Sequence, residues 1–209
     1  MQLSTIQFMP KLSKASKMPC ESFSTPAQAC ITGAKLAKIK GSVCYGCYAK
    51  KGNYHYPNVK APREHNLSLL DNLEQWAFDM QALIRMTNTS GFFRWHDSGD
   101  IQSLAHLLAI VDIAKAMPEI RFWIPTKEKG ILNQFKRLGH TVPDNLVIRL
   151  SMAMINQAPN NSAWHLTSTV TDNGEVYGAQ CNSNKTGGKC LTCRTCWDSS
   201  VTNVNYSKH

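Results

Sequence analysis

Cysteines are the residues of this sequence whose spacing points most directly to chemistry. The chain has eight cysteines among 209 residues, and none lies between positions 48 and 180. The C-terminal set is Cys181, Cys190, Cys193 and Cys196, spaced C-x8-C-x2-C-x2-C. Such a run is typical of ferredoxins, where the thiolates of a [4Fe–4S] cluster bind different irons. It predicts an iron–sulfur cluster, with zinc as the alternative, although zinc usually takes two separated ligand pairs.

A second set of cysteines lies near the N-terminus: Cys20, Cys30, Cys44 and Cys47. The C-x2-C pair Cys44/Cys47 predicts a metal knuckle, whereas Cys20 and Cys30 are widely spaced and either can be a buried structural thiol. The eight thiols can form two four-ligand sites, one site plus spare thiols, or a zinc ribbon that joins one C-x2-C pair from each end. The sequence leaves this pairing open and so predicts one or two clusters.

Polar residues follow the short strand expected at 91–95: His96, Asp97, Ser98, Gly99 and Asp100. Lys127 follows the next expected strand in the same way. The carboxyl ends of parallel strands meet at one edge of a sheet, where ligands bind. We therefore expect a catalytic or cofactor-binding site there. Two alternatives exist: His96, Asp97 and Asp100 can ligate a divalent metal for phosphodiester hydrolysis, or Asp100 simply caps the following helix.

Positive charge is concentrated in the first third of the chain. Residues 1–65 hold ten Lys and Arg against two acids, while the whole chain has a formal charge of +9. Lysines neutralise phosphates and tyrosines stack on unpaired bases, so this segment predicts nucleic acid as the partner. The residues expected to bind it are Lys50, Lys51, Tyr54, Tyr56, Lys60 and Arg63. The alternative is a solvated basic loop, or lysines that offset the charge of a thiolate-bound cluster.

The elements that must position these residues follow from hydrophobic periodicity. Apolar residues at helical spacing predict an amphipathic helix over 64–87. An alternation follows: strand 91–95, helix 101–117, strand 120–124, helix 127–138 with Gly139 as its C-cap, and strand 145–152. Such alternation predicts parallel strands, and so an α/β fold, either a partial (β/α) barrel or a short parallel sheet. Residues 165–179 are expected to form a β-hairpin with its turn at 171–174.

Three segments make up this organisation, in what we expect to be one compact domain. Residues 1–63 are a basic, cysteine-rich metal-binding segment, residues 64–154 are the β/α core, and residues 155–209 hold the hairpin and a second cysteine-rich metal-binding segment. Hydrophobic residues make up 43% of the chain, a globular composition. No apolar run approaches the ~20 residues that cross a bilayer, and the N-terminal sequence lacks the apolar core of a signal peptide. We therefore expect a cytoplasmic protein without membrane contact, in which disulfides are disfavoured. The sequence leaves the oligomeric state open.

Four segments of the chain resemble the bacteriophage gene product 88 family: KMPCESFSTPAQAC, VCYGCYAKKGNY, FFRWHDSGDIQS and KCLTCRTCW. The resemblance covers about positions 17–198. It implies a phage origin, and so a place in the cytoplasm of the infected host, and it does not imply an activity.

A remoter resemblance, to radical AdoMet enzymes, has mechanistic content. It implies a partial (β/α) barrel behind a three-cysteine cluster loop, formed here by Cys30, Cys44 and Cys47, with Ser98-Gly99-Asp100 as the motif that holds AdoMet. Thirteen residues separate Cys30 from Cys44, where that superfamily has three. With Cys20 as a fourth ligand, the cluster would be structural or electron-transferring instead.

Together these patterns predict a phage iron–sulfur protein that acts on or near nucleic acid, with radical-AdoMet-like chemistry as one form of that function. Two alternatives stand beside it. The first is a metal-dependent phosphodiesterase or nuclease with structural clusters. The second is a non-enzymatic nucleic-acid-binding module braced by an iron–sulfur cluster or by zinc.

Overall fold

The fold is built on a single eight-stranded sheet. A computed structural model describes residues 9–208. The strands are β1 (Leu12–Ser13), β2 (Ser22–Phe23), β3 (Phe92–Trp95), β4 (Arg121–Thr126), β5 (Leu146–Ser151), β6 (Thr167–Thr171), β7 (Ala179–Gln180) and β8 (Asn203–Ser207). Their order in the sheet is β1-β2-β3-β4-β5-β6-β8-β7, and every neighbouring pair except β1/β2 is parallel. The sheet is open, and the expectation of an α/β fold is confirmed.

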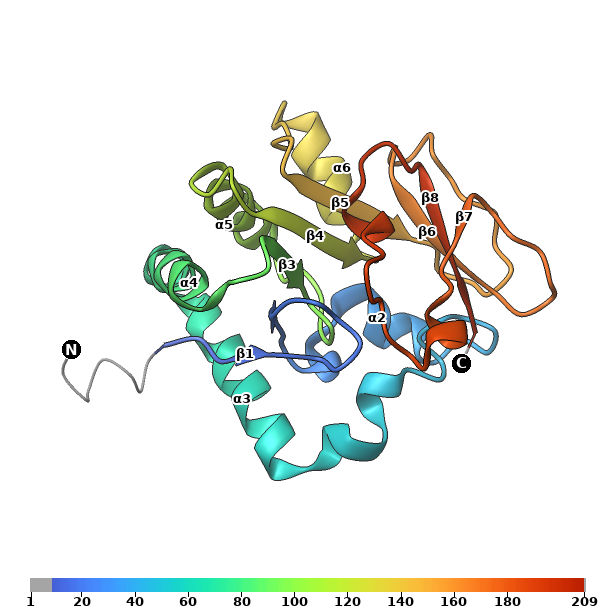
Figure 1. The fold of residues 1–209 in the computed structure, drawn as a ribbon, viewed down its shortest axis with the longest axis horizontal. Coiled ribbons are helices and arrows are strands. Elements are labelled where there is room, and N and C mark those ends of the chain that lie inside the picture. Colours follow the sequence, from blue (N-terminus) through green and yellow to red (C-terminus); the bar gives the residue numbers. More distant parts are fainter. Residues whose placement is uncertain (1–8, 209) are drawn as a thin grey trace.

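The helices are α2 (Ile31–Leu36), α3 (Pro57–Ser68), α4 (Leu73–Thr87), α5 (Leu104–Lys115) and α6 (Lys129–Arg137). From β2 to β6 each new parallel strand is added on the same side of the one before it. Right-handed crossovers then place the connecting helices on one face of the sheet. Figure 1 shows α4, α5 and α6 along one side of β3, β4 and β5. The order is that of a (β/α) barrel that does not close.

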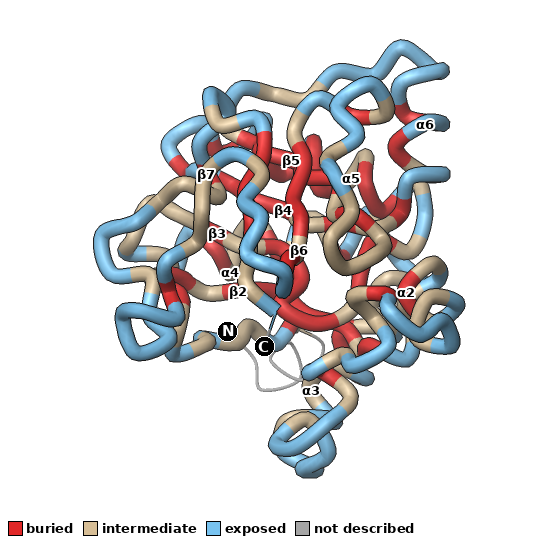
Figure 2. Tube along the Cα trace, turned by 90° about the vertical axis from the view of Figure 1, so that its right-hand side faces the viewer, coloured by how far each residue is buried: buried red, intermediate tan, exposed pale blue. Residues whose placement is uncertain are grey.

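The two faces of the sheet can be told apart by the alternation of side chains along each strand. Phe93, Trp95, Phe122 and Ile148 pack with α4, α5 and α6 in the main hydrophobic core. We call this the helix face. The intervening side chains, such as Trp123 and Val147, pack in a smaller core with Trp197 and residues near Cys20. We call this the inner face, and segments from both ends of the chain cover it. In Figure 2 the central strands are accordingly buried, whereas segments around α2 and α3 are exposed.

The expected central elements are confirmed. The strands expected at 91–95, 120–124 and 145–152 correspond to β3, β4 and β5, and the helices expected at 101–117 and 127–138 to α5 and α6. Gly139 has a positive φ of 76° directly after the last residue of α6 and its cap, as a C-terminal glycine should. None of the helices within residues 9–208 is long and apolar enough to cross a membrane.

The prediction of a single helix over 64–87 is wrong. The structure has two helices, because the chain breaks at Asn72, which has φ −126° and accepts a hydrogen bond from the Gln75 N–H at 3.2 Å. This side chain is the N-cap of α4. The preceding helix α3 begins at Pro57, inside the segment expected to bind metal, with the proline in its first turn. It therefore runs across positions 63 and 64, where two expected segments meet.

The prediction of a hairpin over 165–179 is also wrong. Strands β6 and β7 are not neighbours, because β8 lies between them and pairs in parallel with both. Asn205, which is fully buried, explains the order: its amide donates to Thr171 at 2.9 Å and to Gln180 at 2.7 Å, and it accepts from Thr169 at 2.7 Å. The buried asparagines of β8 thus satisfy the threonines of β6 that lie beside them.

Candidate functional site

Three N-terminal cysteines gather at the carboxyl edge of the sheet. Cys30 is the residue before α2, Cys44 lies in the following loop and Cys47 precedes a 3₁₀ turn. A Cβ atom added to the buried Gly33 would lie 3.6 Å from the Sγ atoms of both Cys30 and Cys44. The two sulfurs are therefore within about 7 Å of each other. We call Cys30, Cys44 and Cys47 the edge thiol group.

Residues that follow β4 and β5 hold the loop of this group in place. The carboxylate of Glu128 accepts hydrogen bonds from the N–H and the hydroxyl of Thr32, at 2.8 and 2.7 Å. Further along, Ser42 forms a β-bridge with Met154, beyond the end of β5. Figure 1 shows α2 beside the carboxyl ends of these strands. Glu128 was missed by the sequence reasoning, although its place after an expected strand is the signal that singled out Lys127.

Lys127 brings a half-buried positive charge to the edge thiol group. Its ammonium donates to the Met152 carbonyl oxygen at 2.8 Å. Burial lowers the pKa of Lys127, while the thiols of the group and Asp100 oppose that shift. Burial also raises the pKa of Cys30 to about 12 and raises that of Cys44. Without a metal these thiols stay protonated at neutral pH, and coordination would displace their protons.

The Ser98-Gly99-Asp100 segment packs tightly against the end of β2. The Ser98 hydroxyl donates to the Thr25 carbonyl oxygen at 2.7 Å, and the Thr25 N–H donates back to the Ser98 carbonyl oxygen at 3.1 Å. Asp100 accepts from the Thr126 hydroxyl at 2.6 Å and from the Lys127 N–H at 2.9 Å. Burial raises the pKa of Asp100 to about 6 in spite of these bonds.

Asp100 is not the cap of the helix that follows. That position belongs to Ser103, whose side chain accepts from the His106 N–H at 3.0 Å. The carboxylate of Asp100 instead joins the end of β3 to the end of β4. The alternative interpretation of Asp100 as a simple N-cap is therefore wrong.

Asp97 lies at the centre of a separate network. The Ser24 hydroxyl donates to its carboxylate, the Tyr54 hydroxyl and Arg63 reach its Oδ2 at 3.3 and 3.4 Å, and the Tyr48 hydroxyl donates to its carbonyl oxygen. The Arg63 guanidinium also stacks 4.8 Å from the centre of the Tyr54 ring. Two of the residues expected on a nucleic-acid surface, Tyr54 and Arg63, thus face inward.

His96 lies in the main core and not in the site. It has a positive φ of 56°, both ring nitrogens lack a protein partner, and its ring is 5.5 Å from that of His106. Burial lowers its pKa well below the ordinary value. His96, Asp97 and Asp100 therefore have separate surroundings, and within residues 9–208 no three His, Cys, Asp or Glu side chains converge on one ion.

The C-terminal cysteines lie on the inner face, and Cys20 lies with them. Cys20, Cys190 and Cys196 belong to the smaller core, and Cys190 donates its N–H to the Lys17 carbonyl oxygen at 2.9 Å. Cys181 and Cys193 act electrostatically on Cys190. We call Cys181, Cys190, Cys193 and Cys196 the inner thiol group. The structure therefore arranges the cysteines as three and five, whereas the sequence suggested two sets of four.

Arg149 organises the loop that carries the end of this group. It is fully buried and donates to five backbone carbonyls, those of Thr167, Thr195, Cys196, Asp198 and Val201. No carboxylate pairs with it among the described residues. A buried cation in these surroundings favours negative charge on the neighbouring thiols.

Comparison with known proteins adds a family. A family model described as gene product 88 matches residues 5–199. This chain belongs to the gene product 88 family. No curated protein and no solved structure shows a significant match.

The remaining basic residues of the gene product 88 chain lie outside the Asp97 network. Lys51, Tyr56 and Lys60 are exposed, and Lys50 is half-buried. Lys60 pairs with Glu64 at 3.3 Å, one helical turn away. Lys50 and Lys51 form no ion pair within the described residues.

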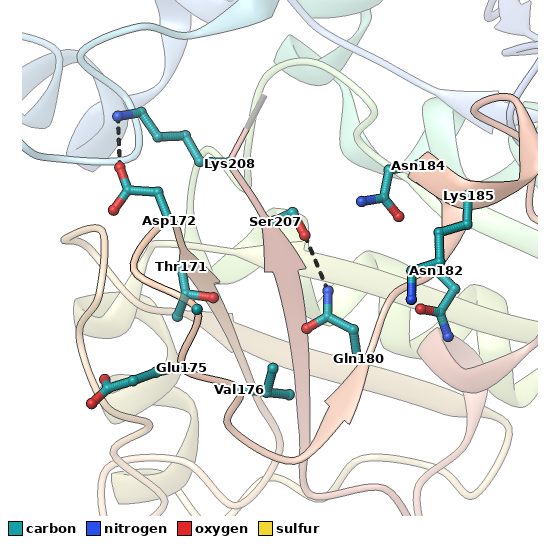
Figure 3. Close-up of a pocket in the computed structure, with 11 residues that line it drawn as sticks. Thr171, Asp172, Glu175, Val176, Gln180, Asn182, Asn184, Lys185, Ser207 and Lys208 are labelled. Atoms are coloured by element: carbon teal, nitrogen blue, oxygen red, sulfur yellow. Dashed lines mark hydrogen bonds and ion pairs between the residues drawn. The ribbon is translucent and has the colours of Figure 1, made fainter.

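A polar pocket of about 430 Å³ opens at the carboxyl ends of β6 and β8 (Figure 3). Two of its four charged residues pair with each other, since Lys208 reaches Asp172 at 2.8 Å. Gln180 and Ser207 are hydrogen-bonded across it at 3.2 Å. This pocket therefore lies at the carboxyl edge of the sheet, as the edge thiol group does.

Proposed function

We propose that this protein is an iron–sulfur protein in which the edge thiol group holds one [4Fe–4S] cluster. The observation that carries the proposal is the approach of the Cys30 and Cys44 thiols at Gly33, with Cys47 close enough to act electrostatically on both. The donors are all sulfur, which suits iron–sulfur clusters and zinc. Zinc needs its ligands about 2.3 Å from a single ion. A cubane binds each thiolate at a different iron, which fits thiols that gather without converging on one point.

A second cluster, held by the inner thiol group, is part of the proposal. Support comes from the spacing of these cysteines and from the buried Arg149 beside Cys196. The Tyr206 hydroxyl lies 3.1 Å from the Cys196 sulfur and can stabilise it as a thiolate. Cys20 is available as a further ligand from the other end of the chain.

Radical-AdoMet-like chemistry is the finer form of this function, and the topology favours it. Six parallel strands, β2, β3, β4, β5, β6 and β8, follow each other in order, and the edge thiol group comes after the first of them. Ser98-Gly99-Asp100 comes after the second. Held by Cys30, Cys44 and Cys47 alone, a [4Fe–4S] cluster would keep one iron without a protein ligand, and the chemistry it would supply is electron transfer to AdoMet. Asp100 and Lys127 would then offer a carboxylate and an ammonium to that ligand.

Nucleic acid is the proposed partner, and the reducing cytoplasm of a phage-infected cell is the proposed location. The positive charge around the edge thiol group supports the partner. All eight cysteines are free thiols, which supports a reducing compartment.

Anaerobic purification tests the proposal. We expect a brown protein with iron and acid-labile sulfide in equal amounts. Replacing Cys44 with Ser should remove the iron of the edge site and leave that of the inner site, whereas Cys193→Ser should do the reverse. A colourless protein loaded with zinc would overturn the proposal.

Activity assays then distinguish radical-AdoMet-like chemistry from the two alternative functions. Reductant plus AdoMet should release 5′-deoxyadenosine from the wild type, and Asp100→Asn should reduce that release. Cleavage of a labelled strand that depends on added divalent metal and on Asp97 would instead establish a hydrolase with structural clusters. Strand binding with neither reaction would establish a non-enzymatic module.

A further inference from the structure

Exposed apolar and aromatic side chains are concentrated beside the edge thiol group. Half of the large hydrophobic residues that the described part of the chain exposes fall within residues 31–56: Ile31, Ile39, Tyr45, Tyr48 and Tyr56. The same stretch holds five lysines and no acid: Lys35, Lys38, Lys40, Lys50 and Lys51. None of these lysines forms an ion pair within residues 9–208. We call these tyrosines and lysines the basic tyrosine surface.

Two of the tyrosines are next to thiols. Tyr45 follows Cys44 and Tyr48 follows Cys47, and each tyrosine is 57% exposed. The Tyr48 hydroxyl points inward and donates to the Asp97 carbonyl oxygen, while its ring meets the edge of the Tyr54 ring at 5.7 Å. The ring of Tyr48 is therefore held in place at its inner end while the rest of it stays open to solvent. A fixed aromatic face loses little entropy when a planar ligand stacks on it.

We propose that the basic tyrosine surface binds single-stranded nucleic acid and places an unpaired base beside the edge thiol group. The lysines neutralise phosphates, and the exposed rings accept bases of any sequence by stacking. The bases of a duplex are stacked on each other, so their faces are not free to stack on tyrosine rings. A duplex therefore binds this surface only through the attraction between its phosphates and the lysines. This inference deepens the proposed function, since it names the substrate class of that same site.

Titration of the full-length, anaerobically purified protein with a fluorescein-labelled oligo(dT) 20-mer tests the inference by anisotropy. For single strands the logarithm of affinity falls with the logarithm of salt by about 0.7 per phosphate contact. The triple variant Lys40→Gln, Lys50→Gln, Lys51→Gln should lower this slope by about 2. A matched triple on α6, Lys129→Gln, Lys136→Gln, Arg137→Gln, removes the same charge from exposed positions elsewhere and should leave the slope unchanged.

Stacking has its own test. Tyr45→Ala should weaken binding of the oligo(dT) strand by about tenfold, because each stacked base contributes on the order of 1–3 kcal/mol. Tyr45→Phe keeps the ring and should bind within about twofold of the wild type. Equal losses in both variants would overturn the stacking interpretation.

Three further results would overturn the inference: no binding of the strand, equal affinity for a 20-base-pair duplex at matched salt, or tighter binding to vesicles of anionic lipid. Iron and sulfide are measured on the same samples. A protein that holds its clusters but binds no strand refutes this inference and leaves the proposed function standing. Strand binding by a protein that holds zinc supports the surface and refutes the iron–sulfur function.

Discussion

Gly99 shows how closely the loop after β3 is packed against β2. It has a positive φ of 81°, and a Cβ atom there would lie 2.8 Å from the carbonyl oxygen of Thr25. Both the conformation and the space exclude any other residue, because a side chain would be strained in the left-handed region and would also collide with backbone. The position of Asp100 depends on this contact.

Gly99→Ala should therefore reduce the free energy of unfolding by about 3 kcal/mol. The matched control is Gly174→Ala, where φ is +86° but the space around the new Cβ is open. It should cost only the conformational strain, about 1–2 kcal/mol. Urea unfolding of both variants measures the difference, and equal losses would contradict the close packing at Thr25.

The buried histidines make stability depend on pH. Burial lowers the pKa of His106 to about 3, and that of His96 also falls. The unfolded chain takes up protons near pH 6.5, whereas the folded protein does not. The contribution of these histidines to the free energy of unfolding is therefore fully present above about pH 6.5. It is lost on acidification toward pH 3, by up to about 1.4 kcal/mol per pH unit for each histidine. Asp100 opposes this loss of stability, because its raised pKa makes the folded protein bind a proton more tightly than the unfolded chain does.

Replacing His106 with Gln should flatten the dependence of unfolding free energy on pH between 6.5 and 4. The exposed His140, changed in the same way, should leave the slope as it is in the wild type. Chemical denaturation at a series of pH values gives the slope. If the His106 variant kept the wild-type slope, another group would be responsible.

At the scale of elements, the decisive feature is the insertion of β8. Its buried asparagines bond to the threonines of β6 on one side and to β7 on the other. The sheet beyond β6 is thus held together by polar side chains and not by an apolar surface. Loss of a single buried amide leaves several partners unsatisfied.

Asn205→Ala should lower the free energy of unfolding by about 2–3 kcal/mol, because three hydrogen bonds disappear from a dry interior. Asn173→Ala, in the exposed segment that follows β6, should change stability by less than about 0.5 kcal/mol. Thermal melts followed by circular dichroism compare the two. A small effect at Asn205 would show that β8 can leave the sheet without disturbing β6.

The same element shows where sequence reasoning ends. Strands β3, β4 and β5 could be predicted because they are short apolar runs between helices. The sequence NVNYS of β8 is polar at two of its three buried positions, so it has the pattern of a loop until its threonine partners are known. Strands of two residues, such as β2 and β7, are too short for any periodicity.

The placement of the candidate site residues was predictable in part. The C-x2-C spacing and the polar residues after β3 singled out segments that the structure brings close together, since Asp100 and Lys127 act electrostatically on the edge thiol group. The sequence did not show that Cys20 joins the C-terminal cysteines or that Arg63 turns inward to Asp97, because both depend on contacts between distant parts of the chain.

At the scale of the whole molecule, the thiol groups lie in segments outside the main core. That core draws its buried residues from positions 23 to 164, on the helix face. The proposed clusters bind on the carboxyl edge and on the inner face. Metal binding should therefore stabilise these segments without being required for the core.

Removing iron with a chelator should raise amide hydrogen exchange in residues 30–47 and 181–197. Protection in α5, β4 and β5 should change by less than about threefold, because their hydrogen bonds lie within the main core. Exchange measured by mass spectrometry on holo and apo protein resolves the segments. Uniform loss of protection would mean that the clusters hold the entire fold.

The position of β8 also has a consequence for biosynthesis. The sequence places β7 between β6 and β8, so a ribosome delivers β7 first. At about 5–20 residues per second, the 31 residues between the end of β6 and the start of β8 take roughly 2–6 s to make. During that interval the open edge of β6 faces β7, its neighbour along the chain. The native order therefore requires the nascent protein to leave that edge unpaired, or to release a temporary hairpin, until the later strand arrives.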